Sequence, residues 1–515
     1  MPSFDSPFIL LAAGATVIYI LVLVWRQVAS PLLSIPGPIL ARFTDIWYLW
    51  AVRAGNFQRH NRRLHELYGP IVRYGPNRYS LNHPEATKII YSHKSSFQKS
   101  RWYAAFGQIH EWTLFSDDDV KRHSQNRRQY QSLYSMSSLV TYEPFVDECI
   151  SIFRQRLAEL AHAKHPMNMG HWMQCYAFDV IGLMTYSKRI GFLDQGEDVG
   201  GVMGALENMI FYASLAGLTP SLHPYMFRLK NWLAGKKGVG RAYVIDFTRQ
   251  RVAEHQARPK SELIEFNDDD EGQPGAQKLG FLSKFYGKHT RDPESFTGYH
   301  VIAGCTHNMI AGSDTTAITL SACLYYLLRH PRTFSKLRAE IDQLRRDESR
   351  TTREVTFKES QEMPYLQAVI KETLRIHPAT GLPLERVVPK GGATISNRFF
   401  PEGTIVGVNT WVEHRNPQIW GEDVDEFKPE RWLIDDSDRL AFMNRHWMPF
   451  GLGARTCLGR HISMLETSKL IPSLVGDFDF KLHGRLANPE AEWNLANYWF
   501  VKPKDFMVRV TLRET

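Results

Sequence analysis

The chain has 515 residues, of which 43% are hydrophobic and 12% aromatic. This composition can fill a large core, so it excludes an intrinsically disordered protein. The formal net charge of +8 would suit nucleic acid, an anionic membrane or an acidic protein partner. Because the basic residues are spread out and not interleaved with aromatic residues, we expect no nucleic-acid binding and favour the other two partners.

An uncharged apolar stretch, FILLAAGATVIYILVLVW, occupies residues 8–25, and Arg26 follows it directly. Its length can cross a bilayer core, and the charge after it places the body of the protein on the cytosolic side. A cleaved signal peptide is disfavoured, because no basic region precedes the stretch and no small-residue cleavage site ends it. We therefore expect a transmembrane anchor over 1–30 and a single domain over 31–515, with a stiff Pro-rich segment between them.

The hydrophobic periodicity predicts a mainly α fold with small β-sheets. We expect strands within 40–100, 384–410 and the last 40 residues, an irregular stretch over 411–456, and a surface loop over 257–278. Helices are expected at 139–190, 200–216, about 292–328, 333–346, 359–376 and just after Cys457. The helix at 292–328 is apolar almost all round, so we expect it to be buried and to cross the whole molecule.

The cysteines are Cys149, Cys175, Cys305, Cys323 and Cys457. They are widely spaced and form no CxxC pair, so neither a zinc ribbon nor a disulfide framework is expected. Cys457 differs from the others because it lies in the glycine-rich segment WMPFGLGARTCLGRHISMLE, at the entrance of a predicted helix.

A helix N-terminus favours a thiolate over a thiol, and glycines let the backbone approach a flat cofactor closely. Arg455 could pair with an anionic group of that cofactor. Two alternatives remain for the cysteine alone, a structural role or a nucleophile with His461 as its partner.

The segment also resembles the haem-binding loop of the cytochrome P450 family, Phe-x-x-Gly-x-Arg-x-Cys-x-Gly. Phe450 opens the match, and two variable positions that include Gly451 follow it. The remaining fixed positions are Gly453, Arg455, Cys457 and Gly459. The resemblance implies the cytochrome P450 fold and haem b as the cofactor, with Cys457 as the axial ligand of the iron.

Further motifs follow the family's order. Glu372 and Arg375 form its Glu-x-x-Arg, and Pro429–Trp432 resembles its Pro-Glu-Arg-Phe motif, which implies a buried ionic triad of Glu372, Arg375 and Arg431. The segment AGSDTT, Ala311–Thr316, matches the family's acid–alcohol pair. The resemblance makes Asp314 a proton relay and Thr315 the holder of a water molecule, and Gly312 would leave room for dioxygen. Arg127 and Arg386 occupy places where the family contacts haem propionates, and His123 replaces a tryptophan that is common there.

The implied activity is insertion of one oxygen atom from dioxygen into a hydrophobic small molecule. Because no nucleotide-binding glycine motif is evident, we expect a separate reductase. The anchor resembles that of endoplasmic reticulum members of the family, which implies that membrane as the location and an NADPH-dependent flavoprotein reductase as the partner. Exposed basic residues could dock that partner, or be only solvated charge: Lys121, Arg122, Arg128, Arg460 and His461.

The segments LYSMSSLVTYEPFVD and GRHISMLETSKLIPSLVGDFDF are similar to those of pisatin-demethylase-like fungal members of the family, which suggests secondary metabolism. Substrate contacts are expected from Trp102, Tyr103, Phe106, Trp112, Phe115, His307, Ile310, Leu382, Leu384, Tyr498, Trp499 and Phe500. A haem-thiolate isomerase or dehydratase and a non-catalytic haem protein remain the alternatives.

Overall fold

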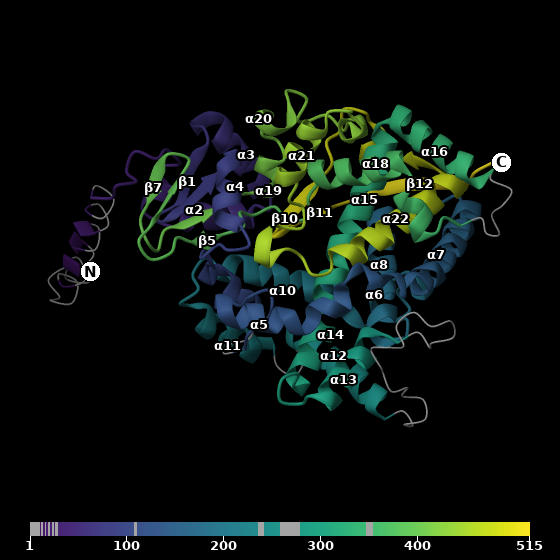
Figure 1. Ribbon diagram of the computed structural model, residues 1–515, viewed down its shortest axis with the longest axis horizontal. Coiled ribbons are helices and arrows are strands. Elements are labelled where there is room, and N and C mark those ends of the chain that lie inside the picture. The colour runs from purple at the N-terminus through teal and green to yellow at the C-terminus, as the bar shows by residue number, and fades with distance from the viewer. Residues whose placement is uncertain are drawn as a thin grey trace, which may run out of the picture.

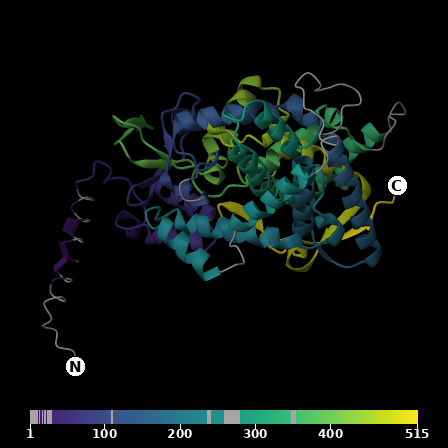
Figure 2. The ribbon, with the colours of Figure 1, turned by 90° about the horizontal axis from the view of Figure 1, so that it is seen from below.

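The computed structural model describes residues 29–107, 111–234, 241–257, 279–346 and 354–514, with single residues between Leu11 and Trp25. Helices dominate, and small sheets lie at the edges of the helical body (Figures 1 and 2). The predicted class, mainly α with small β-sheets, is confirmed. The predicted loop at 257–278 lies outside the described residues from 258 onward.

The helices of the first half are α2 (Ile46–Arg53), α3 (Phe57–Tyr68), α4 (Pro84–Tyr91), α5 (Val120–Gln131), α6 (Met136–Val140), α7 (Glu143–Ala163), α8 (Met169–Tyr186), α9 (Phe192–Gln195), α10 (Val202–Ala216), α11 (His223–Ala234) and α12 (Arg241–Gln256). Those of the second half are α13 (Phe281–Arg291), α14 (Gly298–Gly312), α15 (Asp314–Arg329), α16 (Pro331–Arg345), α17 (Phe357–Gln361), α18 (Pro364–Ile376), α19 (Thr410–Glu413), α20 (Pro417–Trp420), α21 (Ser437–His446) and α22 (Arg460–Asp477). Three 3₁₀ turns matter for the site: η2 (Arg101–Phe106), η7 (Pro429–Trp432) and η8 (Gly453–Arg455).

The largest sheet joins two distant parts of the chain in the order β1-β2-β8-β5-β3. Its strands are β1 (Ile71–Gly75), β2 (Arg78–Leu81), β3 (Gln98–Lys99), β5 (Arg386–Val387) and β8 (Ile405–Gly407). The antiparallel register of β3 and β5 sets Lys99 opposite Arg386. The other strands are β4 (Met167–Asn168), β6 (Ala393–Ile395), β7 (Arg398–Phe400), β9 (Phe478–Leu482), β10 (Leu495–Tyr498), β11 (Phe500–Pro503) and β12 (Met507–Leu512). β12 pairs with both β4 and β9, β10 pairs with β11, and β6 pairs with β7.

The main core surrounds α15, which packs against α8, α18 and α22. The side chains of α15 are buried on nearly every side, as its apolar sequence predicts. Cys149, Cys175, Cys305 and Cys323 lie in this core as small apolar residues, a common role for free cysteine.

The long helix expected over 292–328 is two helices, because α14 ends at Gly312 and α15 begins at Asp314. Hydroxyl groups compete for the helix carbonyls at this point. Ser313 Oγ donates to Met309 O at 2.8 Å and Thr315 Oγ1 donates to Ala311 O at 2.6 Å. Such side-chain bonds bend or interrupt a helix. The start is also later than expected, because Thr297 caps α14 with His300.

Other expected helices are divided where the sequence offers a cap or a proline. Residues 139–190 contain α7 and α8 on either side of β4, and residues 359–376 contain parts of α17 and α18, which separate before Pro364. Residues 411–456, expected to be irregular, contain α19, α20 and α21.

The anchor expected at residues 8–25 lies largely outside the described residues. Among the residues that are described, one helical segment, Val199–Ala216, has the length and composition to cross a membrane. Of its window, 44% is buried inside the protein. It packs against α12, α2 and η2, as a core helix does.

Candidate functional site: the cysteine loop and the interrupted helix

The loop before α22 positions Cys457 through a tight backbone path. Gly451 and Gly453 have φ of +69° and +63°, a region that side chains disfavour. A Cβ on Gly453 would also collide with the carbonyl oxygen of Tyr91. The amide of Cys457 donates to Phe450 O at 2.8 Å and closes the loop. These contacts give the glycine-rich pattern its physical reason.

The thiol of Cys457 faces a space within the protein. The side chain is exposed, yet burial is the main influence on its pKa and raises it. Backbone N–H groups of Gly459 and Arg460 donate to the sulfur, and these bonds and the Arg127 and Arg460 cations lower the pKa. The sulfur is therefore accessible, desolvated and supplied with donors, which is the environment of a thiolate ligand.

Four cations converge beside this space. Arg127 comes from α5, Arg386 from β5 and Arg455 from η8, the three arginines that the sequence predicts as anion contacts. Lys99, which sequence reasoning missed, joins them from β3. Among the described residues, none of the four lies within ion-pair distance of a carboxylate.

Burial and mutual repulsion lower the pKa values of Arg455 and Lys99, and the nearby Asp117 offsets this effect only in part. Burial, then the charge of Arg386, lowers the pKa of Arg455 to about 10. Burial followed by Arg386 and Arg455 places the pKa of Lys99 well below its ordinary value. Arg455 Nη1 donates to Asp117 O at 2.7 Å, whereas its Nη2 is buried without a hydrogen-bond partner. Buried cations with a vacant donor are costly unless a multiply charged anion binds.

His123, the neighbour of this cluster on α5, is neutral. Burial, followed by the charge of Arg455, lowers its pKa to about 3. It can therefore offer a neutral hydrogen bond but no further positive charge.

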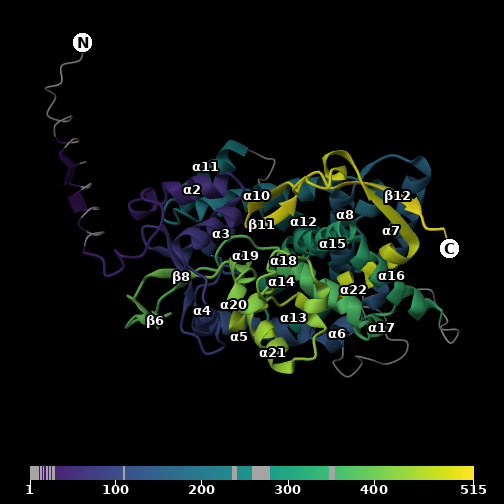
Figure 3. The ribbon, with the colours of Figure 1, turned by 90° about the horizontal axis from the view of Figure 1, so that it is seen from above.

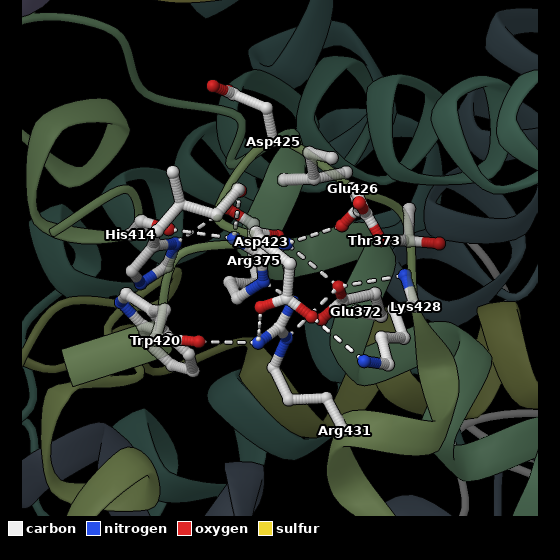
Figure 4. Close-up of polar contacts among 12 residues, drawn as sticks. Glu372, Thr373, Arg375, His414, Trp420, Asp423, Asp425, Glu426, Lys428 and Arg431 are labelled. Atoms are coloured by element: carbon white, nitrogen blue, oxygen red, sulfur yellow. Dashed lines mark hydrogen bonds and ion pairs between the residues drawn. The ribbon is translucent and has the colours of Figure 1, made fainter. Parts of the chain in front are cut away.

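The predicted ionic triad is present beneath the loop (Figure 4). Arg375 Nε and Nη2 lie 2.9 and 2.8 Å from the two oxygens of Glu372. Arg431 Nε lies 3.5 Å from Glu372 Oε1, and its Nη1 lies 2.7 Å from Asp423 Oδ1. All the remaining donors of Arg375 have carbonyl partners, on His414, Val424 and Glu426. The pairing satisfies charges that would be expensive alone.

His414, another residue that the sequence motifs did not indicate, connects this triad to the cysteine loop. Its Nδ1 donates to Arg375 O at 2.9 Å, and its Nε2 accepts the amide of Met448 at 2.9 Å. Burial, then the Arg375 charge, lowers its pKa to about 3, so the ring is neutral and both bonds persist. Met448 lies two residues before Phe450, so the triad supports the loop that holds Cys457.

Asp314 and Thr315 lie at the break between α14 and α15. Thr315 and Ala311 are accessible in the middle of a buried helix, and Asp314 is buried. The carboxylate of Asp314 accepts Gln174 Nε2 at 2.6 Å and lies 2.7 Å from Lys502 Nζ. A Cβ on Gly312 would meet Ile181 of α8 at 2.8 Å, so this glycine allows α14 and α8 to approach closely. Room for dioxygen beside Gly312 stays a prediction.

The residues expected to contact a substrate divide into groups. Trp499 contacts Trp102, Tyr103, Phe106 and Phe115 with ring centroids 5.0–6.2 Å apart. Trp112 instead packs on Tyr299, and Tyr498 and Phe500 line a separate cavity. Trp499 has a φ of +88°, a strained conformation for a large side chain that is typical of functional sites.

Comparison with known proteins agrees with this arrangement. The family model "Cytochrome P450" matches residues 37–509. The chain belongs to the cytochrome P450 family. Pisatin demethylase from Fusarium vanettenii is 38% identical over 485 residues, which cover 93% of this chain and 90% of that protein. A cytochrome P450 monooxygenase from Aspergillus terreus is 38% identical over 461 residues, covering 87% and 90%. The monooxygenase cicH from Emericella nidulans is 35% identical, covering 95% of each chain.

Cytochromes P450 bind haem through a cysteine thiolate, and this P450 is a haem-thiolate monooxygenase. The residues present fit that cofactor. The accessible, desolvated sulfur of Cys457 would serve as an iron ligand, and the four cations, which have no carboxylate partner among the described residues, would suit the two propionates. The vacant donor Arg455 Nη2 adds a specific place for a carboxylate oxygen.

Proposed function

We propose that Cys457 is the axial ligand of the haem, and that the chain oxidises a hydrophobic small molecule of fungal secondary metabolism. The observation that carries the proposal is the single cysteine whose sulfur is accessible, desolvated and bonded by two backbone amides. Phe450 and Gly451 shape its loop, and Arg127, Arg386 and Arg455 bind the propionates with Lys99.

When bound, the haem supplies the reductive cleavage of dioxygen, which the thiolate favours. The protein delivers protons and holds a water molecule in a defined place. The Thr315 hydroxyl would hold a water molecule at the haem site, and Asp314 would pass protons from solvent to that water. The hydroxyl of Thr315 is held by Ala311 O at 2.6 Å, so its orientation is fixed before a ligand enters.

The substrate is an apolar and largely flat molecule. The aromatic cluster around Trp499 offers rings from two separate segments, and such surfaces favour flat apolar ligands. Pisatin demethylase, by its name, acts on pisatin. For this chain we propose a flat, apolar small molecule of secondary metabolism, with pisatin as the first candidate to test.

Electrons come from a separate NADPH-dependent flavoprotein reductase that binds transiently. Lys121 lies in the first turn of α5, Arg128 lies in its last turn, and Arg460 begins α22; all three are exposed. Arg122 is partly engaged by Asp117, at 2.6 Å. An exposed basic surface attracts an acidic partner and raises its association rate.

We also propose that the chain is held on the endoplasmic reticulum membrane by residues 1–30, with residues 31–515 in the cytosol. Exposed apolar side chains support this orientation, because α2 and α11 lie along one edge of the molecule (Figure 3). Trp50 of α2 is 59% exposed, and Leu229 and Trp232 of α11 are 57% and 77% exposed. Large exposed apolar side chains of this kind suit a membrane surface.

The function is tested by reconstitution with a fungal P450 reductase and NADPH. A panel of fungal and plant phenolics that includes pisatin is screened for gain of one oxygen atom, or loss of a methyl group, by mass spectrometry. Product that requires NADPH, reductase and dioxygen supports the proposal. Conversion of a hydroperoxide without reductase would instead establish the isomerase or dehydratase alternative.

A further inference from the structure

The side chain of Asp314 lines a cavity on one side of α15. This cavity, of about 210 Å³, is lined by α8, α15 and the β10–β11 hairpin. Asp314 and Ala317 lie at its buried floor, and Asn168 and Glu207 are exposed at its rim. The cavity is large and polar enough for several water molecules.

We propose that this cavity is the route by which protons reach Asp314, and that Lys502 is the residue that positions the Asp314 carboxylate at its floor. The inference rests on the role proposed above for Asp314. It adds a second residue and a location for the entry of protons, apart from the aromatic cluster.

The ion pair defines the orientation of the acid. Lys502 Nζ lies 2.7 Å from Asp314 Oδ2, and the two side chains are 22% and 0% exposed. Gln174 Nε2 donates to the other oxygen at 2.6 Å. A buried carboxylate needs such partners to stay ionised. Lys502 is partly exposed, so it connects the buried acid to the surface without a large desolvation of its own.

A second polar group on the same face supports the presence of water. Ser321 lies seven residues after Asp314 and therefore on the same side of α15. Its side chain is 1% exposed, lines the cavity, and its hydroxyl has no hydrogen-bond partner. Buried hydroxyls of this kind are normally satisfied by ordered water.

The neighbouring Thr315 points away from this cavity. Consecutive helix residues differ in direction by about 100°, and Thr315 does not line the cavity whereas Asp314 does. The helix break at Ser313 therefore lies between two spaces, with the acid on one side and the alcohol on the other. The Asp314 carboxylate takes up a proton from cavity water and then releases one toward Thr315, so it returns to its ionised form after each transfer. The cavity water recovers its proton from solvent.

The charged and titratable groups that face the cavity come from several elements. Besides Asp314 they are His171 of α8, Glu207 of α10, Tyr498 of β10, Lys502 of β11 and Lys504 just after that strand. His171 Nε2 donates to Gly196 O at 2.8 Å, and Glu207 and Lys504 are exposed. Within the described structure, Lys502 is the cation paired with Asp314.

The test uses the full-length holoenzyme with reductase and NADPH, and no organic substrate. NADPH oxidation and hydrogen peroxide release are followed across the neutral pH range. In Lys502→Met we expect the pH of half-maximal NADPH oxidation to move upward, because the Asp314 carboxylate loses its cationic partner, and Lys502→Arg should restore the wild-type profile. Lys481→Met, an exposed lysine on β9, should match the wild type.

A second readout does not depend on turnover. The thermal midpoint of unfolding is compared for Lys502→Met, Asp314→Asn and the double variant. Lys502→Met should lower the midpoint more in the wild-type background than in the Asp314→Asn background, because the ion pair is already absent in the latter.

The outcomes are distinguishable. If the stability cycle shows coupling but Lys502→Met leaves the pH profile unchanged while Asp314→Asn alters it, the pair is only structural and the inference is overturned. If Asp314→Asn itself has the wild-type profile, the proposed role of Asp314 fails and the inference fails with it. A shifted profile in Lys502→Met that Lys502→Arg restores supports the inference.

Discussion

At the scale of single residues, the chemistry depends on side chains that are adjacent in sequence but face different surroundings. Asp314 is bound by Lys502 and Gln174, whereas Thr315 has an accessible side chain held by Ala311 O. Substitutions of Asp314 and of Thr315 should therefore have different effects. The effect of replacing Thr315 is the easier one to measure.

Thr315→Ala should retain the haem and its thiolate ligand but divert NADPH into hydrogen peroxide. The reason is that the water held by the hydroxyl would no longer be fixed beside the reacting oxygen. The measurement is the ratio of peroxide released to NADPH consumed. Thr319→Ala is the matched control, since Thr319 also bonds a carbonyl one turn back, Thr315 O at 3.0 Å. Equal ratios in the two variants would exclude a special role for Thr315.

Arg127→Gln should weaken haem retention, because the cation has no carboxylate partner within the described structure and is available to a propionate. Loss of such a supporting contact typically costs roughly ten- to a hundredfold in affinity for the bound group. Transfer of haem to an excess of apomyoglobin measures the change. Arg128→Gln, an exposed neighbour on α5, should transfer haem at the wild-type rate. Identical rates for both variants would remove Arg127 from the site.

Residues within the motifs were predictable because their spacing is local. Cys457, Arg455, Glu372 and Arg375 follow from short patterns. Lys99 and Lys502 could not be found this way, because strand pairing and the packing of β11 on α15 bring them to their partners. No local pattern marks a lysine whose partner is about 190 or more residues away along the chain.

At the scale of elements, the polar contacts between α18 and the cysteine loop hold that loop in place. Glu372 and Arg375 are fully buried on α18, Arg431 comes from η7, and His414 links them to Met448. The elements are short and irregular, so they depend on these polar bonds more than helices with extensive apolar faces do.

Arg375→Met should destabilise the protein strongly, since it leaves the Glu372 carboxylate buried with fewer partners. Breaking one side of a buried pair costs about 3–5 kcal/mol, and a lower midpoint of urea unfolding measures it. Arg59→Met is the control, because its pair with Glu492 is largely exposed and such pairs contribute little. A similar midpoint for both variants would show that the triad does not contribute this much to the free energy of unfolding.

Helices and strand regions were predictable from periodicity, but their interruptions were not. The apolar pattern over 292–328 is continuous, and only the hydroxyls of Ser313 and Thr315 divide it. Whether a hydroxyl bonds its own helix depends on surrounding packing, which a single sequence does not specify. The pairing of residues 71–99 with 386–407 likewise depends on the complete fold.

At the scale of the whole molecule, buried neutral histidines make stability depend on pH. Burial lowers the pKa of His65 to about 4, of His377 to about 4 and of His414 to about 3, against about 6.5 in the unfolded chain. Below about pH 6.5 these histidines bind protons in the unfolded chain but stay neutral in the folded chain. The stabilisation is therefore complete above that pH and is lost as the pH falls toward the folded values.

Each such histidine should contribute a slope of about 1.4 kcal/mol per pH unit in this window. The measurement is the thermal midpoint of unfolding as a function of pH. His377→Phe should flatten the acid side of the curve, whereas His93→Phe, at an exposed position, should not. A steeper or unchanged curve in His377→Phe would contradict the assignment.

The proposed function depends on Cys457 holding the haem iron as a thiolate. The direct measurement is the absorption spectrum of the reduced protein with carbon monoxide, for wild type, Cys457→Ala and the buried-cysteine control Cys323→Ala. We expect the red-shifted Soret band of a thiolate-ligated complex in wild type and in Cys323→Ala, and its loss in Cys457→Ala. Persistence of that band in Cys457→Ala, or its absence from the haem-loaded wild type, would show that Cys457 is not the thiolate ligand.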